Sequence, residues 1–198
     1  AIRHMAEFLS FRLSEHGLLN TRSAAEIKSA IGPKHMAVSV SGVIKQQDDR
    51  VVEKRGPKIG APQQAIDGFC KSAGILESQL VTRQTNKGAF YFAEILEKGR
   101  HSETLIPELI NNLVAEFPWP KSQRWGTSRL SWVRPLHYIN VVLDGALLPG
   151  SLDLGGGMSI EFTNAGYGHS AYHNTPFEIT GFEQYVNKMH ELDVLVAL

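Results

Sequence analysis

The sequence has little of what would define a disulfide-bonded or membrane-bound protein. It contains one cysteine, Cys70, among 198 residues, which excludes an internal disulfide and fits a reducing compartment. No apolar run approaches the ~20 residues that a membrane-spanning helix needs. The formal net charge is +0, so any contact with nucleic acid must come from a local basic surface. We therefore expect a cytoplasmic protein that does not associate with membranes.

Recognisable catalytic and nucleotide-binding motifs are also missing. The glycine run at 155–157 lacks the spacing of a P-loop or a dinucleotide-binding loop, and no nucleophile elbow occurs. His169 and His173 have the spacing with which two imidazoles share a metal on a helix, but the glycines around them disfavour a helix. We expect them to be loop histidines, with a metal-dependent hydrolase as the alternative. We predict no catalytic residue, metal ligand or cofactor site in this chain.

The segments that are present mix helical and strand-like patterns. Apolar residues recur at helical spacing in four segments and alternate or cluster as in strands elsewhere. The predicted helices cover residues 2–16, 61–75, 102–117 and 180–192, and the predicted strands cover 36–43, 89–96 and a hairpin over 136–154 that turns at Asp144-Gly145. Because strands and helices alternate without a regular βαβ order, we predict an α+β fold with mixed or antiparallel strands.

Several local features sharpen this prediction. Residues 46–62 are polar, rich in Gly and Pro and without clear periodicity, which indicates a long ordered loop or an exposed edge. In the helix after Pro62 we expect Ala65 to be buried with Ile66, Phe69, Cys70 and Ala73. Ser102 is expected to be an N-cap, and the run 155–157 a flexible break. For the domains we expect an amino-terminal helix and strand over 1–45 and an α+β core over 46–198, or one continuous domain.

Two basic stretches are candidates for contact with RNA. The first, "VEKRGPKI" (52–59), places three cations around a Gly-Pro corner, where it forms either a solvated face or a set of phosphate contacts. The second, "SQRWGTSRLSWVRPLH" (122–137), interleaves arginines with two of the three tryptophans. It predicts either a packed Arg–Trp ladder or a platform of aromatic and cationic side chains for nucleic acid. The RNA-binding candidates are Lys54, Arg55, Lys58, Arg124, Arg134 and His137.

The order of several unusual phrases resembles a known family. The chain contains, in sequence, "DDRVVEKRGPKIGAPQQAIDGFCKSAGI", "TNKGAFYF", "EKGR", "FPWPKSQRWG", "WVRPLH" and "DGALLPGSLDL". These phrases resemble the amino-terminal part of the β subunit of bacterial glycyl-tRNA synthetase, over nearly the whole chain. The resemblance implies a class II aminoacyl-tRNA ligase of two α and two β subunits. In it the α subunit activates glycine with ATP, and the β subunit mainly binds tRNA.

The resemblance also implies which functions to compare. We expect the chain to be the first part of a longer β subunit that supports tRNA binding and assembly with α, without an active site of its own. The alternative is a free-standing RNA-binding or assembly module derived from that subunit. It is motivated by departures from the family pattern: the family's T-P-R-R-L-A is here residues 32–37 without either arginine, and its T-R-G-H-R-F is here 166–171, again without arginine.

Overall fold

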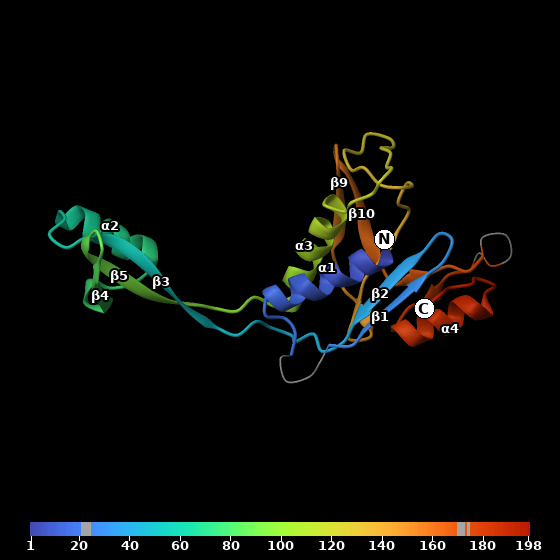
Figure 1. The fold of residues 1–198 in the computed structure, drawn as a ribbon, viewed down its shortest axis with the longest axis horizontal. Coiled ribbons are helices and arrows are strands. Elements are labelled where there is room, and N and C mark those ends of the chain that lie inside the picture. Colours follow the sequence, from blue (N-terminus) through green and yellow to red (C-terminus); the bar gives the residue numbers. More distant parts are fainter. Residues whose placement is uncertain (21–24, 170–172, 174) are drawn as a thin grey trace. The chain divides into compact units, whose positions relative to one another are not determined.

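The chain forms two compact units (Figure 1). The computed structural model describes residues 1–20, 25–169, 173 and 175–198. The larger unit consists of Ala1–Gln46 together with Arg100–Leu198, and the smaller unit is the continuous insertion Gln47–Gly99. The sequence-based division placed a boundary at residues 45 and 46 but none near residue 99. Helices combined with mainly antiparallel sheets confirm the predicted α+β class.

The smaller unit is a three-stranded antiparallel sheet with one helix. Its strands lie in the order β3-β5-β4, so the longest strand is central. The elements are β3 (Arg50–Lys58), α2 (Gln63–Ala73), the short 3₁₀ helix η1 (Glu77–Gln79), β4 (Leu80–Thr85) and β5 (Gly88–Glu97). For residues 46–62 we expected either a long ordered loop or an exposed edge. The exposed edge is confirmed, because β3 is an edge strand, and the loop is wrong for residues 50–58. The strand predicted at 89–96 is confirmed.

Helix α2 is amphipathic and covers one face of this sheet. It follows Pro62 and ends at Gly74, whose φ of 67° suits glycine. Ile66 and Cys70 are buried, as expected, whereas Ala65 is exposed, so that expectation was wrong. Ala65 lies one position before Ile66, and a one-residue step turns a side chain by about 100° around a helix.

The larger unit begins with a helix and a β-hairpin. Helix α1 (Ile2–Glu15) ends where Gly17 takes a φ of 63°. The Leu18 N–H donates to the Leu13 carbonyl at 2.8 Å, which closes the turn in a Schellman arrangement with both leucines buried. Strands β1 (Ile27–Ile31) and β2 (Met36–Val40) then pair antiparallel. The predicted strand at 36–43 is thus confirmed for its first part, and β1 was not predicted.

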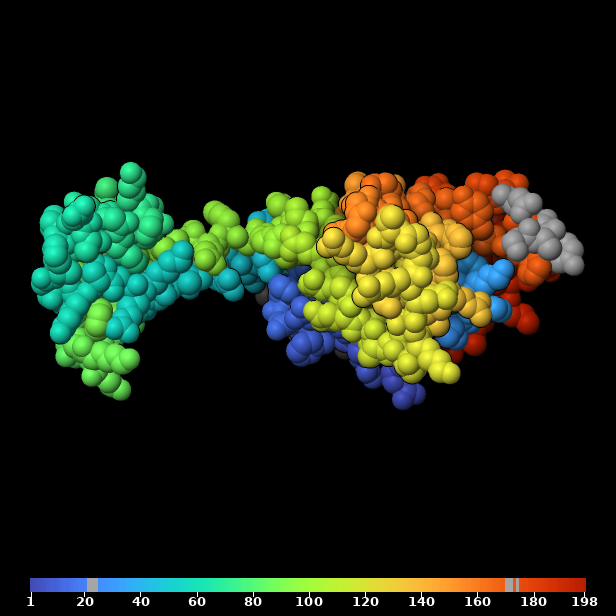
Figure 2. Space-filling view, turned by 90° about the horizontal axis from the view of Figure 1, so that it is seen from above, coloured from blue at the N-terminus to red at the C-terminus, as the bar shows by residue number. Residues whose placement is uncertain are grey.

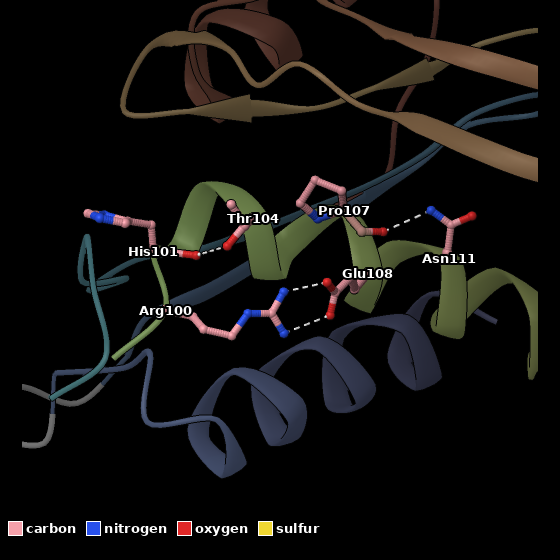
Figure 3. A network of polar contacts seen from close by, with 6 residues as sticks. All are labelled: Arg100, His101, Thr104, Pro107, Glu108 and Asn111. Atoms are coloured by element: carbon pink, nitrogen blue, oxygen red, sulfur yellow. Dashed lines mark hydrogen bonds and ion pairs between the residues drawn. The ribbon is translucent and has the colours of Figure 1, made fainter. Parts of the chain in front are cut away.

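Helix α3 (Ser102–Ala115) is tied to its surroundings by a polar network at its start (Figure 3). His101, not Ser102, is the N-cap; the buried Ser102 hydroxyl instead donates to the Lys45 carbonyl at 3.1 Å. The expectation for Ser102 was therefore one residue off. The Arg100 guanidinium forks onto the Glu108 carboxylate, and this hydrogen bond lowers the pKa of Glu108. The helix continues through Pro107, whose carbonyl accepts a hydrogen bond from Asn111 Nδ2 at 2.9 Å.

The carboxyl-terminal part contains short strands and a final helix. β10 is central in a sheet of order β6-β10-β9, and two further pairs are β7-β8 and β11-β12. The bounds are β6 (Ile139–Asn140), β7 (Val142–Leu143), β8 (Ala146–Leu147), β9 (Ser151–Gly155), β10 (Met158–Thr163), β11 (Ala165–Gly166), β12 (Phe177–Glu178) and α4 (Phe182–Glu191). The predicted Asp144-Gly145 turn is confirmed, with positive φ at both residues.

The glycine run at 155–157 is an ordered turn and not the flexible break that the sequence suggested. It joins β9 to β10, and all three glycines have φ between 65° and 79°. A Cβ at Gly156 would lie 2.0 Å from the Thr127 carbonyl oxygen. Glycine is needed here both for the left-handed backbone and for the close approach of the neighbouring chain.

Buried apolar side chains form three clusters, all in the larger unit. The first lies under α3 and the β6-β10-β9 sheet, the second between α4 and the β1-β2 hairpin, and the third around the end of α1. Helix α4, predicted at 180–192, buries Tyr185, Val186 and Met189 in the second cluster. Within the described part of the chain, no helix is long and apolar enough to cross a membrane.

Candidate nucleic-acid interface

The arginine- and tryptophan-rich segment 122–137 is an irregular loop held by main-chain hydrogen bonds. Gln123 and Trp132 exchange two of them, at 2.8 and 3.0 Å. The Arg129 and Leu130 N–H groups both donate to the Leu154 carbonyl, which fastens the loop to β9. Figure 2 shows residues near this segment, in yellow, on one face of the larger unit. The segment therefore has a fixed backbone from which its side chains project.

The tryptophans of this segment are structural. Trp132 is 6% exposed, and its ring centre lies 5.0 Å from those of both Phe117 and Trp119. Trp125 is half-buried against the same cluster. The Arg–Trp ladder is not formed: among the described residues, guanidinium groups lie over only the rings of Phe8 and Phe90. Of the two alternatives for this segment, the packed one holds for the Trp132 ring, but without the stacking on arginine that it included.

The three candidates of this segment are all exposed. Arg124, Arg134 and His137 point away from the core that buries Trp132. None of the ion pairs found among the described residues includes them. They could contact an anion, but the structure brings no aromatic ring beneath either arginine.

The three candidates of the first basic stretch lie on β3 of the smaller unit, on two different faces of its sheet. Lys54 is paired with Ala93, which is 0% exposed, whereas Arg55 is paired with Phe92. A Cβ at Gly56 would lie 2.5 Å from the Phe69 ring of α2. Because side chains alternate along a strand, Lys54 shares the face that α2 covers and Arg55 points to the opposite face.

Arg55 and Lys58 converge at one end of the sheet. The Arg55 guanidinium carbon lies 3.7 Å from the centre of the Phe90 ring, a close cation–π contact. Lys58 is paired with Phe90 across a bulge in β3 and reaches over the turn that joins β4 to β5. A Cβ at Gly88 in this turn would lie 2.9 Å from Lys58 Cε. The structure therefore places two of the predicted cations around one exposed hairpin end.

The charges at the two ends of this sheet are arranged differently. At the far end Arg50 pairs with Glu97 at 3.0 Å. Lys98 pairs with Asp49 at 2.6 Å, and this hydrogen bond lowers the pKa of Asp49. Arg83 is shared between the carboxylates of Glu53 and Glu94. The described residues offer no carboxylate partner to Lys54, Arg55, Lys58 or Lys87.

Lys87 was not among the predicted candidates. It lies in the turn Asn86-Lys87-Gly88 that joins β4 to β5. Pairing of β3 with β5 brings this turn to the end of β3 that carries Lys58. A cation in a turn directly before the strand-like run 89–96 was the available signal. We define Arg55, Lys58 and Lys87 as the basic end of the smaller unit.

The two histidines considered as a metal pair belong to none of the described helices or strands. The His173 N–H donates to the His169 carbonyl at 2.8 Å, and His173 Nε2 lies 3.1 Å from Asp193 Oδ2. No group of three His, Cys, Asp or Glu side chains that could hold a metal occurs within 1–20, 25–169, 173 and 175–198. The departures from the family pattern at Ser170 and Ala171 lie outside the described residues.

Two other residues that differ from the family pattern both contact Tyr138. His35 and Tyr167 stand where the resemblance led us to expect arginines. His35 Nε2 lies 2.7 Å from the Tyr138 hydroxyl, and the rings of Tyr138 and Tyr167 are 5.5 Å apart. Burial lowers the pKa of His35 and raises that of Tyr138. These two positions thus contribute to a small aromatic cluster and carry no fixed positive charge.

Comparison of the sequence with known proteins shows which family it matches. The family described as "Glycyl-tRNA synthetase beta subunit" matches residues 1–198. A glycine–tRNA ligase beta subunit of Rhodospirillum centenum is 35% identical over 184 residues, with 83% of this chain and 26% of that protein covered. The corresponding subunit of Phenylobacterium zucineum is 34% identical over 197 residues, 99% of this chain and 28% of that protein. That of a Ruegeria species is 38% identical over 168 residues, 83% of this chain and 24% of that protein.

The matches cover nearly the whole chain but only a part of each relative. The chain spans about a quarter of the length of the curated relatives that it matches. The similarity runs through both units, since the family match is continuous across the insertion Gln47–Gly99. The chain belongs to the glycyl-tRNA synthetase beta subunit family.

Proposed function

We propose that this chain is the tRNA-binding and assembly segment at the amino-terminal side of a glycine–tRNA ligase β subunit. In this proposal the α subunit activates glycine with ATP and carries the active site, and two α and two β subunits form the ligase. The chain itself contributes positioning of tRNA and no catalytic group. The observation that carries the proposal is the basic end of the smaller unit, where exposed cations have no carboxylate partner among the described residues.

The electrostatics support contact with a polyanion. A cation that is already paired with a carboxylate gains little from a phosphate, since the first partner must be lost. Arg50, Arg83 and Lys98 are paired in this way, but Arg55 and Lys58 are not. Each phosphate contact releases condensed counterions from the RNA, which makes the affinity depend on salt. A net-neutral chain can therefore bind RNA locally, through this end of the sheet.

Assembly with an α subunit is supported by the family and by one exposed apolar residue of helix α1. The relatives are named beta subunits, a name that implies a partner. Phe11 on α1 is 65% exposed, while Leu13 two positions later is buried in the larger unit. A large exposed aromatic ring is a common anchor for a partner protein.

The experiment that tests the RNA role is a titration of tRNA by fluorescence anisotropy across a series of salt concentrations. Arg55→Ala and Lys58→Ala should each lower the slope of log K against log salt by about 0.7–0.9 and weaken all tRNAs alike. Arg50→Ala is the matched control, because Arg50 lies on the same strand but is paired with Glu97. A flat salt dependence of the unmodified protein would remove the RNA role and leave assembly as the better account.

A free-standing RNA-binding or assembly module is the second candidate, because the expected arginines are absent at His35 and Tyr167. The two candidates differ in whether the chain supports aminoacylation. Co-purification with a glycyl-tRNA synthetase α subunit, followed by glycylation of tRNA with and without the β subunit that contains this chain, separates them. Binding to α with restored glycylation supports the ligase, and RNA binding without either supports the module.

A further inference from the structure

The smaller unit leaves one face of its sheet without a covering element. Its only α-helix, α2, packs against β3 and β5 on the face that carries Ala93, and all residues of this unit are described. On the opposite face Val51 is 66% exposed and Leu96 is 57% exposed. Apolar side chains on such a face lose little water on folding, so their presence is not explained by the core of this unit.

Two neighbouring rows of side chains run across this open face. The first row is Lys58, Phe90 and Arg83, and the second is Arg55, Phe92 and Val81, each taken in the order β3, β5, β4. Phe90 and Phe92 are two residues apart on the central strand and therefore share a face. Both rings are only half-buried. The face thus presents two aromatic rings at its centre with Arg55 and Lys58 at its β3 edge, whereas Arg83 at its β4 edge is paired with Glu53 and Glu94.

The contact between Arg55 and Phe90 prepares a stacking surface. The guanidinium lies over the ring at 3.7 Å, and the Arg55 side chain is exposed, so its outer face is open to solvent. A planar guanidinium or aromatic ring on a sheet offers a nucleobase a flat partner. A base has a free face of this kind only when it is unpaired and unstacked, which distinguishes a single strand or loop from a duplex.

We infer that the open face of β3, β5 and β4 binds an unpaired nucleotide of RNA, with its base against Arg55, Phe90 and Phe92. The phosphates on either side of that nucleotide contact Lys58 and Lys87 at the hairpin end. This inference rests on the proposed role in RNA binding and adds which kind of RNA segment is bound. The charge is the reason for choosing RNA over a protein partner: Arg55, Lys58 and Lys87 have no carboxylate partner among the described residues, whereas the two carboxylates of this face, Glu53 and Glu94, are both paired with Arg83.

The test compares the affinities of the 198-residue chain for two RNA probes. One is a single-stranded oligonucleotide of mixed sequence, and the other is a blunt duplex with the same number of phosphates. The unmodified chain should bind the single strand more tightly. Phe90→Leu, which keeps an apolar side chain on the strand, should weaken single-strand binding by roughly 5- to 100-fold, with less than a twofold effect on the duplex. The salt slope should not change, because no cation is removed.

Further variants make the result specific. Phe90→Tyr should restore single-strand binding, since it restores an aromatic ring. Leu96→Ala, at the far end of the same face, should leave binding unchanged. Phe90→Trp introduces the first tryptophan of the smaller unit, and its fluorescence should be quenched by the single strand and not by the duplex. This last measurement stands even if Phe90→Leu fails to fold.

Two outcomes contradict different parts of the account. If RNA binds with a salt dependence but Phe90→Leu and the Trp signal show no preference for a single strand, the stacking role is wrong and the phosphate role stands. If no RNA binds in a salt-dependent manner, the proposed RNA role is wrong as well. Loss of α-subunit binding in Phe90→Leu with unchanged RNA affinity would overturn the inference and assign the face to a protein.

Discussion

The two units use their aromatic residues in opposite ways. All three tryptophans and all eight histidines of the chain belong to the larger unit, where Trp132 packs into a cluster with Phe117 and Trp119. In the smaller unit the fully buried side chains are few, namely Ile66, Cys70 and Ala93. Phe90 and Phe92 remain at its surface beside exposed cations.

This difference separates packing from recognition. A large apolar ring in a cluster stabilises the fold through the area that it removes from water. A ring on an uncovered sheet contributes little to stability but is available to a ligand. Substitutions in the larger unit should therefore act mainly on stability, and those on the open face of the smaller unit mainly on binding. The following changes test this division.

The largest expected effect is that of Trp132→Ala. Since Trp132 is 6% exposed, its truncation should lower the free energy of unfolding of the larger unit by about 3–5 kcal/mol. Urea unfolding followed by circular dichroism measures it. Trp125→Ala is the control, with a smaller loss because that ring is half-buried. An unchanged midpoint in Trp132→Ala would mean that the ring is exposed and would restore the RNA-platform interpretation of this segment.

Ile66→Ala should destabilise the smaller unit by about 2–5 kcal/mol, because Ile66 is one of its few buried side chains. Hydrogen exchange should show loss of protection in α2 and in β3, β4 and β5, while α3 and the β6-β10-β9 sheet keep theirs. Ala65→Ser, at the exposed neighbouring position, is the control. Equal loss of protection throughout the chain would mean that the two units do not unfold separately.

Gly88→Ala probes the turn beneath Lys58. Gly88 has a φ of 115° and Gly60 has a φ of 88°, so alanine at either position should cost about 1–2 kcal/mol of backbone strain. Only at Gly88 would the new Cβ meet Lys58, whereas nothing lies within 4 Å of a Cβ at Gly60. We expect a lower tRNA affinity for Gly88→Ala and not for Gly60→Ala. Equal affinities in the two variants would argue against a role for the Lys58 position.

The smallest effect concerns pH. Burial, and then the charge of Lys34, lower the pKa of His35, so the unfolded state takes up a proton first as the pH falls. The stability that the neutral ring contributes is complete above the unfolded pKa of about 6.5 and declines below it. Unfolding of the larger unit should thus become easier between about pH 7 and 5, and less so in His35→Gln. The smaller unit contains no histidine and should not respond in this range.

The sequence was a good guide to elements with a strong local signal. The 3.6-residue period predicted α2, α3 and α4, and Asp144-Gly145 predicted the β7-β8 turn, because these signals lie within a few residues. It was a poorer guide to β1 and β3. These strands are polar or irregular in pattern, and they are stabilised by pairing with β2 and β5, which periodicity along a single segment does not show.

The candidate site was only partly predictable for the same reason. Arg55 and Lys58 were identified from a charge run together with Lys54. The face of the sheet on which each of them lies depends on which face α2 covers. Lys87 and Phe90 come from a segment about thirty residues later, and only the pairing of β3 with β5 brings them to the basic end. Spacing along the chain therefore indicates candidate cations, whereas register decides which of them act together.

The most direct test of the central claim compares the two units in one experiment. The tRNA affinity of Arg55→Ala/Lys58→Ala is measured across a salt series beside that of Arg124→Ala/Arg134→Ala, with equal charge removed in each. The account predicts that the first pair lowers the slope of log K by about 1.4–1.8, two phosphate contacts, and that the second pair lowers it by less. An equal or larger decrease of the salt slope in Arg124→Ala/Arg134→Ala would contradict the assignment of RNA contact to the smaller unit.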